Sequence, residues 1–195
     1  METKNIFLTG KKRSGKSTMI NNILNELDIN YSGYRTLPYY INNEARGFYL
    51  NGYVDCVGNN SPISIKIGEE KCIPIIESFE VVGVSILEKS IEFSNTKLIL
   101  LDEIGRLESN AYTFKKRIVE ALDSEKVVLG VLQKAENEFL IDIIKREDTV
   151  VFDIDNLTNY EINEVNKKIL DIIKLLLKGW GKLWRNLRKL LAYLF

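Results

Sequence analysis

Two hydrophobic patterns alternate along this chain, and each predicts a different kind of element. Runs of consecutive apolar residues are typical of strands buried on both faces. They predict strands at residues 5–9, 97–103, 126–133 and 149–153. Apolar residues that recur every three or four positions predict helices at residues 18–28, 79–91, 109–122 and 136–147. This alternation predicts an α/β fold with a mainly parallel sheet and right-handed crossovers.

Residues 31–76 follow a third pattern, with short alternating segments separated by Asn, Gly and Pro. The segments at residues 47–55 and 63–67 predict a β-rich insertion, a small antiparallel hairpin beside the main sheet. Six of the nine tyrosines fall in this region: Tyr31, Tyr34, Tyr39, Tyr40, Tyr49 and Tyr53. We expect them to pack on the sheet, because aromatic residues are common in strands, and base stacking is the alternative.

The C-terminal part of the chain has an apolar stripe at helical spacing. The stripe begins at Ile162 and continues through Trp180 and Trp184, with Lys182 and Arg185 on the opposite face. Gly179 and Gly181 weaken a helix at this point. We therefore predict a main domain over residues 1–173 and a basic amphipathic helix over residues 174–195.

The segment 179–195 has three alternative roles. It packs on its own domain or on a second copy of the chain, it lies on an anionic membrane surface, or it fills a groove of a partner protein. Trp and Leu opposite Lys and Arg are typical of helices at a membrane interface. The hydrophobic pattern by itself does not select one of the three.

Charge and composition narrow the function classes. The chain of 195 residues is 45% hydrophobic and 28% charged, which is typical of one globular domain with an ordinary core. Its 27 basic and 27 acidic residues balance over the whole chain. From Lys174 onward, however, there are six basic residues and no acidic residue. The remaining 21 basic and 27 acidic residues make the body acidic, so we predict no specific nucleic-acid binding.

Several absences in the sequence also bear on function. Residues 1–9 leave no room for a signal peptide, and no uncharged apolar run is long enough to span a bilayer. We therefore expect a cytoplasmic protein, with membrane contact only through the C-terminal helix. Cys56 and Cys72 are expected to be reduced thiols. The absence of histidine excludes Ser-His and Cys-His nucleophiles and argues against structural zinc.

A glycine-rich loop joins the first strand to the first helix. Its pattern, G-x-x-x-x-G-K-S/T, in the order strand, loop, helix, predicts a phosphate-binding P-loop (Walker A) rather than an ordinary βα turn. The main-chain N–H groups of such a loop and the helix N-terminus attract anions. The predicted nucleotide-binding residues are Gly10, Lys11, Lys12, Arg13, Ser14, Gly15, Lys16, Ser17 and Thr18.

Two acidic residues complete the predicted chemistry. Asp102 and Glu103 end a buried strand, as in a Walker B motif, and in a parallel sheet that edge also carries the P-loop. We expect Lys16 to reach the β- and γ-phosphates, and Ser17 and Asp102 to hold Mg²⁺, Asp102 through a water. Glu103 is then placed to accept a proton from an attacking water. The alternative is that both acids are solvated residues at the start of a loop.

The sequence around these acids resembles a known family. Residues 101–108, Leu-Asp-Glu-Ile-Gly-Arg-Leu-Glu, resemble the D-E-I-G-K/R-M/L-E signature of the thermostable-type nucleoside-triphosphatase family, which includes the cancer-related nucleoside triphosphatase. Gly33-Tyr34-Arg35-Thr36 resembles the G-F-x-T of that family, and the similarity spans roughly residues 4–172.

The resemblance implies both a fold and an activity. It implies a three-layer P-loop NTPase of the RecA-like (ASCE) class, with an added strand between the P-loop strand and the Walker B strand. It implies that Mg²⁺ supports hydrolysis of nucleoside 5′-triphosphates, ATP, GTP and others, to NDP and phosphate. By the same resemblance Glu103 is the catalytic carboxylate.

The chain departs from the family at two places. The P-loop of the family reads G-x-P-G-x-G-K-T-T, and Lys12 and Arg13 replace its proline and inner glycine. Together with Lys11 these cations either favour a polyanionic ligand or are solvated, and we expect them to be solvated. After the last strand the family has an Asn-Arg pair, whereas Asn156 is followed by Leu157.

The sequence leaves two rival functions open. A nucleotide or small-molecule kinase has the same P-loop, but adjacent Asp and Glu at a strand end favour water as the nucleophile. A switch that binds a membrane or a partner in response to nucleotide is the non-enzymatic alternative. Gln133, at the end of its strand, either senses the γ-phosphate or is an ordinary polar residue at a strand end.

Overall fold

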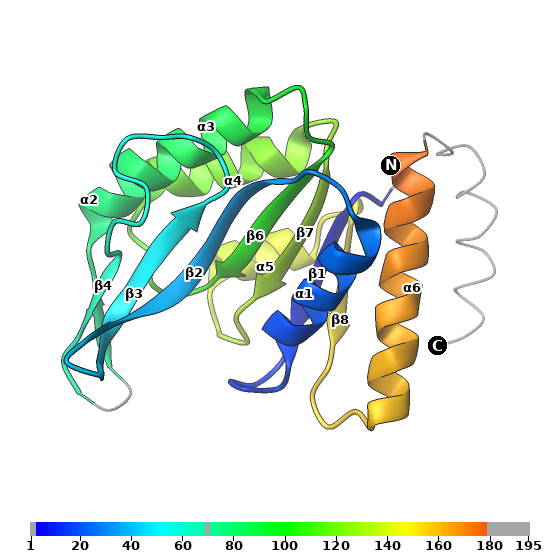
Figure 1. Cartoon of the computed structure of the whole chain (residues 1–195), viewed down its shortest axis with the longest axis horizontal. Coiled ribbons are helices and arrows are strands. Elements are labelled where there is room, and N and C mark those ends of the chain that lie inside the picture. Colours follow the sequence, from blue (N-terminus) through cyan, green and yellow to red (C-terminus); the bar gives the residue numbers. More distant parts are fainter. Residues whose placement is uncertain (1–2, 69–70, 179–195) are drawn as a thin grey trace.

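The computed structural model describes residues 3–68 and 71–178, which form a central sheet covered by helices on both faces (Figure 1). In spatial order its strands are β3 (Glu44–Gly52), β2 (Ser32–Ile41), β6 (Leu98–Ile104), β7 (Val127–Leu132), β1 (Asn5–Thr9) and β8 (Thr149–Asp153). All neighbouring strands are parallel except β2 and β3. The strand β7 lies between β1 and β6, so the added strand implied by the resemblance is confirmed.

The helices form the two outer layers of the fold. One face of the sheet carries α1 (Lys16–Leu27) and α6 (Asn159–Leu177), which contact each other. The other face carries α3 (Val84–Glu92), α4 (Tyr112–Asp123) and α5 (Glu138–Ile144). A short helix, α2 (Ile76–Ser78), and a π-helical turn, η1 (Phe79–Gly83), lead into α3. The three-layer α/β fold is therefore confirmed.

Each central strand supplies two cores, which explains its continuous apolar sequence. Successive side chains of a strand point to opposite faces. Ile6 and Leu8 of β1 pack in the core under α1 and α6, whereas Phe7 packs in the core under α3, α4 and α5. All three are fully buried. The hydrophobic effect thus holds β1, and with it the loop that follows β1, between the two helical layers.

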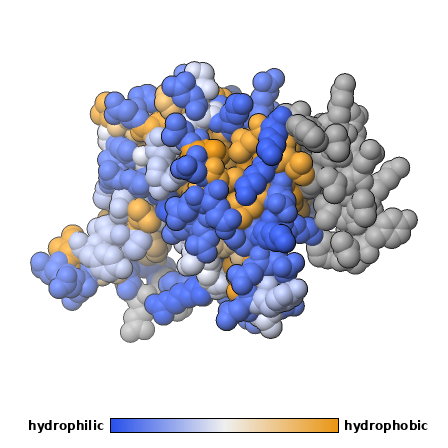
Figure 2. Space-filling model, turned by 45° about the vertical axis from the view of Figure 1, so that its right-hand side comes forward, coloured by the Kyte–Doolittle hydropathy of each residue, from blue (hydrophilic) through white to orange (hydrophobic). Residues whose placement is uncertain are grey.

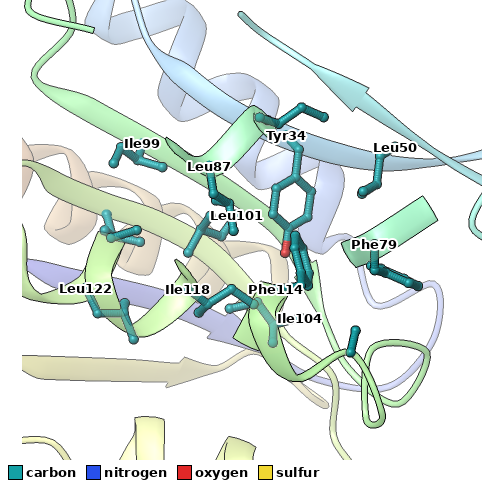
Figure 3. Packing of buried hydrophobic residues seen from close by; sticks show 14 of the residues in the cluster. Tyr34, Leu50, Phe79, Leu87, Ile99, Leu101, Ile104, Phe114, Ile118 and Leu122 are labelled. Atoms are coloured by element: carbon teal, nitrogen blue, oxygen red, sulfur yellow. The ribbon is translucent and has the colours of Figure 1, made fainter. Parts of the chain in front are cut away.

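An aromatic cluster fills the core on the α4 face. Tyr34 of β2 packs against Phe114 of α4 with their ring centroids 5.6 Å apart, and Phe79 lies 5.2 Å from Phe114. Figure 3 shows the Tyr34 hydroxyl directed into this cluster beside Phe114. That hydroxyl is buried and has no hydrogen-bond partner among the residues that the structure describes. Tyr34 therefore packs on the sheet as predicted, whereas Tyr40 is 61% exposed.

The predicted strands and helices are present, with some changes of boundary. The fourth predicted helix is shortened to α5, and the Asn137 side chain caps its first turn. The third predicted helix begins at Tyr112 rather than Ser109, because the residues before it form a turn in which Glu108 accepts a hydrogen bond from the Gly105 N–H. Hydrogen bonds between side chains and the main chain decide where both helices begin, and the hydrophobic pattern of the sequence does not reveal such bonds.

The expected position of the hairpin is corrected by the structure. The strands β2 and β3 do pair antiparallel, but β2 is a strand of the main sheet and pairs parallel with β6 from Ser32 to Arg35. Gly33 permits this, because a Cβ at that position would lie 2.0 Å from the Leu100 carbonyl oxygen. Within residues 3–68 and 71–178, only β4 (Ser64–Lys66) and β5 (Cys72–Pro74) form a separate two-stranded sheet.

The C-terminal helix agrees with the predicted stripe as far as it is described. Ile169 and Ile173 of α6 are fully buried, and a capping box at Thr158 and Glu161 starts this helix. The helix continues past residue 173 and ends at Leu177. The segment 179–195 lies outside the described residues. The division into residues 1–173 and 174–195 stays a prediction.

The side of the molecule that carries α6 has an apolar area on its surface. Figure 2 brings the α6 side forward and shows an apolar area bordered by hydrophilic residues. In the described part of the chain, no helix has the length and apolar character needed to cross a membrane. Cys56 and Cys72 are both unpaired, as predicted.

Candidate functional site

The P-loop connects the buried end of β1 to the first turn of α1. Gly10 and Gly15 have φ angles of 150° and 94°, a region that side chains disfavour. A Cβ on Gly10 would lie 2.8 Å from the Ser14 hydroxyl and 3.0 Å from Asp155 Oδ1. The two glycines of the motif are therefore required by backbone conformation, and Gly10 also by space.

Arg13 adopts a backbone conformation that favours glycine. Its φ angle is 66°, in the left-handed region, and its side chain is exposed. The inner glycine of the family P-loop corresponds to this position, where Arg13 adopts the left-handed conformation although it bears a Cβ. Lys11 and Lys12 are exposed as well, in agreement with the expectation that these cations are solvated.

Lys16 is buried against the loop that precedes it. Its ammonium donates hydrogen bonds to the main-chain oxygens of Gly10 at 2.8 Å and Lys11 at 2.7 Å. The side chain thus lies along the inside of the loop, where an anion held by the loop N–H groups would meet it. Ser17 and Thr18 begin α1 and are exposed.

An acidic residue that the sequence did not suggest holds the P-loop from outside. Asp155, just after β8, accepts a hydrogen bond from the Lys11 N–H at 2.6 Å. Lys134 donates to Asp155 at 2.9 Å and to Asp153 at 2.8 Å. The Lys134 hydrogen bond, followed by that of Lys11, lowers the pKa of Asp155. The only hint in the sequence was the position of these residues just after the predicted strands.

Asp102 and Glu103 lie at the carboxyl end of β6, where its pairing with β7 becomes irregular between Leu101 and Ile104. The peptide bond between the two acids is cis. Asp102 is buried and Glu103 is half-buried. Burial raises the pKa of Asp102, and Arg35 and then Lys16 oppose that rise. Burial also raises the pKa of Glu103, opposed by Lys16.

Lys16 therefore acts electrostatically on both acids. The P-loop cation and the two strand-end carboxylates, which are far apart in sequence, converge at one edge of the sheet. This convergence was expected from the parallel arrangement of β1 and β6. A second cation was not expected. The Arg35 Nε lies 3.1 Å from Asp102 Oδ2.

A tight turn follows the two acids and contacts Gln133. The Gln133 side-chain oxygen accepts a hydrogen bond from the main-chain N–H of Arg106 at 3.0 Å. The main-chain N–H of Gln133 donates to the main-chain oxygen of Ile104 at 2.8 Å. A Cβ on Gly105 would lie 2.7 Å from that side-chain oxygen. Gln133 thus lies beside the turn that follows Glu103, as a γ-phosphate sensor or an ordinary strand-end residue would.

Glu108 closes the same turn from inside the protein. It is buried and accepts a hydrogen bond from the Gly105 N–H. Burial raises the pKa of Glu108 to about 7, although that hydrogen bond and one from its own N–H act in the opposite direction. The last residue of the Asp102–Glu108 signature is therefore structural: it fixes the turn.

Comparison with known proteins identifies the family. A family model described as NTPase matches residues 5–170. The chain belongs to this NTPase family. A nucleoside-triphosphatase THEP1 from Thermotoga sp. strain RQ2 is 28% identical over 173 residues, which cover 87% of this chain and 95% of the relative. A nucleoside-triphosphatase THEP1 from Thermofilum pendens is 26% identical over 165 residues, which cover 79% of this chain and 88% of the relative.

Solved structures agree with the NTPase fold. The crystal structure of THEP1 from Aquifex aeolicus has a TM-score of 0.66 at 20% identity and covers 87% of this chain and 98% of its own. The solution structure of a human cancer-related nucleoside triphosphatase has a TM-score of 0.67 at 22% identity, covering 88% and 97%. The family resemblance and the fold that it implied are confirmed.

Proposed function

We propose that this NTPase hydrolyses nucleoside triphosphates, ATP and GTP among them, to NDP and phosphate with the help of Mg²⁺. The observation that carries the proposal is the convergence of Lys16, Asp102 and Glu103 at the carboxyl edge of the sheet. A cation for the phosphates, a carboxylate for a metal and a carboxylate for a proton are the groups that hydrolysis of a phosphoanhydride requires.

In this proposal the P-loop holds the phosphates. The loop residues Gly10–Thr18 direct main-chain N–H groups at the anion, helped by the N-terminus of α1. Lys16 exchanges its hydrogen bonds to the Gly10 and Lys11 oxygens for bonds to the β- and γ-phosphates. The exposed cations Lys11, Lys12 and Arg13 add a positive potential that attracts the polyanion.

The donor atoms present fit Mg²⁺ bound together with phosphate. Mg²⁺ is bound in proteins by one or two carboxylates and by substrate phosphates, rather than by a cage of protein ligands. In the part of the chain that the structure describes, no three His, Cys, Asp or Glu residues are grouped around a metal position. The Ser17 hydroxyl and the Asp102 carboxylate would hold the ion, which when bound offsets the charge of the β- and γ-phosphates.

Glu103 is the proposed general base. Its carboxylate takes a proton from water while the water oxygen bonds to the γ-phosphorus. The bond from that phosphorus to the bridging oxygen breaks, and NDP leaves with the electron pair. Burial raises the pKa of Glu103, which makes this carboxylate a stronger base than a solvated one. Gln133 is the proposed sensor that orients the water.

Phosphate release from a panel of NTPs, with and without Mg²⁺, tests the proposal. Glu103→Gln should still bind nucleotide but hydrolyse it about 100-fold or more slowly, as expected for loss of a general base. Lys16→Ala should lose nucleotide affinity. The matched control is Glu164→Gln, an exposed residue of α6 that belongs neither to the P-loop nor to the end of β6.

Three outcomes of that experiment would contradict the proposal. Full activity of Glu103→Gln would exclude the general-base role. Activity without divalent cation would exclude the metal requirement. Phosphate transfer that begins only when a nucleotide or small-molecule acceptor is added would indicate a kinase.

For the segment 179–195 we propose an association role, with an anionic membrane surface or with a second copy of the chain. The amphipathic sequence of this segment supports it. Co-sedimentation with anionic liposomes, and sedimentation velocity without them, compare the full chain with a chain that ends at Leu177. A membrane role predicts pelleting of the full chain only, and self-association predicts a larger particle only for the full chain. If the two chains behave alike in both experiments, neither role holds.

A further inference from the structure

Arg35 lies next to the carboxylate proposed to bind the metal. Its Nε is 3.1 Å from Asp102 Oδ2, and its Nη1 donates to the Asn21 side-chain oxygen at 2.7 Å. The strands β2 and β6 bring Arg35 and Asp102 into register as direct neighbours. Asn21 lies one helical turn beyond Ser17 in α1. The guanidinium thus connects the strand of Asp102 to the helix that begins in the P-loop.

The ion pair between Arg35 and Asp102 is buried, and some of the Arg35 hydrogen-bond donors have no acceptor among the described residues. The side chains of Arg35 and Asp102 are 13% and 7% exposed. The Arg35 Nε and Nη2 are both buried, and neither has a hydrogen-bond partner among the described residues, so Nε contacts Asp102 as an ion pair without a hydrogen bond. Buried arginines usually bind carboxylates through two parallel hydrogen bonds, which this pair does not form. An ion pair with an unpaired buried donor is easier to exchange for another arrangement than a bidentate one.

A divalent cation at Asp102 would compete with this guanidinium. Both are positive, and in a buried site like charges a few ångströms apart repel strongly. Binding of the ion and release of the guanidinium are therefore linked: whatever weakens the Arg35–Asp102 contact strengthens metal binding, by the same free energy.

We propose that Arg35 is a positioning residue whose guanidinium pairs with the Asp102 carboxylate while the site holds no nucleotide. The metal ion that enters with the nucleotide must displace this guanidinium from Asp102. This inference rests on the proposed function, because it requires that Asp102 binds the metal. In the empty site Arg35 compensates the buried carboxylate. On loading, its guanidinium leaves Asp102 and remains tethered by Asn21. Arg35 thus sets how much metal is needed to load the site.

The test measures Mn²⁺ binding by electron paramagnetic resonance, with full-length protein and saturating ADP, so that it does not depend on turnover. Arg35→Met should lower the Kd for Mn²⁺ roughly tenfold, within the usual range of coupling between two sites. Arg35→Lys retains the charge and should stay close to the wild type. Asn21→Ala, which loosens the tether, should not weaken Mn²⁺ binding. The matched control is Arg117→Met, because Arg117 is ion-paired with Glu88 and Glu120 on the surface.

Two results separate failure of this inference from failure of the proposed function. Asp102→Asn should abolish tight Mn²⁺ binding, and if it does not, the metal role of Asp102 falls and the role of Arg35 with it. If Asp102→Asn abolishes binding but Arg35→Met leaves it unchanged or weakens it, only the competition is wrong. Thermal melts identify a variant that fails to fold, and then the more conservative Arg35→Gln takes the place of Arg35→Met under the same criteria.

Discussion

Asp155 accepts a hydrogen bond from the main-chain N–H of Lys11, although the two residues are 144 positions apart in the sequence. This contact fixes the outer side of the P-loop to the end of β8. Lys134 balances the charge of the carboxylate. The shape of the P-loop therefore depends on residues beyond the loop motif.

Asp155→Ala removes the anchor of the P-loop and should lower the urea midpoint of unfolding. Asp155→Asn keeps an acceptor for the Lys11 N–H, so its midpoint should stay closer to that of the wild type. Both variants are compared by equilibrium unfolding followed by circular dichroism. Equal midpoints for the alanine variant and the wild type would show that the anchor does not contribute to stability.

Arg13→Gly should stabilise the protein by about 1 kcal/mol, because a residue other than glycine in the left-handed region is strained. Lys12→Gly is the matched control. Lys12 is not among the residues with a positive φ, so a glycine there only adds freedom to the unfolded chain and should not stabilise. Urea unfolding of the two variants checks the difference, and a stabilising Lys12→Gly would contradict the explanation.

Glu108 should make stability depend on pH. Its pKa is about 7 in the folded protein, above its usual value of 4.5, because it is buried. The folded state therefore binds the proton more tightly, and the stabilisation is fully present below pH 4.5 and lost as the pH rises through 7. The loss amounts to roughly 3 kcal/mol by pH 8.

Glu108→Gln lacks this titration and can still accept from the Gly105 N–H. Relative to the wild type it should gain stability as the pH rises from 5 to 8, measured as the free energy of unfolding at each pH. The exposed Glu26→Gln serves as the control and should show little change. A difference between Glu108→Gln and wild type that is independent of pH would contradict the prediction.

Tyr34→Phe should raise the free energy of unfolding by about 1 kcal/mol, because it removes a buried hydroxyl that has no hydrogen-bond partner. The G-F-x-T pattern of the family has phenylalanine here. Tyr34→Leu also removes the hydroxyl but leaves a cavity beside Phe114, and should cost about 2 kcal/mol. Urea unfolding measures both, and a destabilised Tyr34→Phe would indicate that the hydroxyl has a partner.

Much of the site was predictable because its residues follow from local sequence and from the geometry of parallel sheets. The P-loop requires glycines at fixed spacing between a strand and a helix, and its conformation at Gly10 and Gly15 confirms that requirement. Asp102 and Glu103 were expected near Lys16 because parallel strands end at one edge, and the charge of Lys16 lowers the pKa of both acids. Boundaries such as the start of α4 depended on side-chain hydrogen bonds that hydropathy does not reveal.

The sequence by itself determined the order of elements, the position of the P-loop and the pair of acids, because hydrophobic period and motif spacing are local properties of the chain. Only the tertiary structure decided that β2 joins the main sheet beside β6. That pairing brings Arg35 to Asp102, as the fold brings Asp155 to Lys11. Such contacts join residues far apart in the sequence, and they form only when strand register and the packing of both faces are complete.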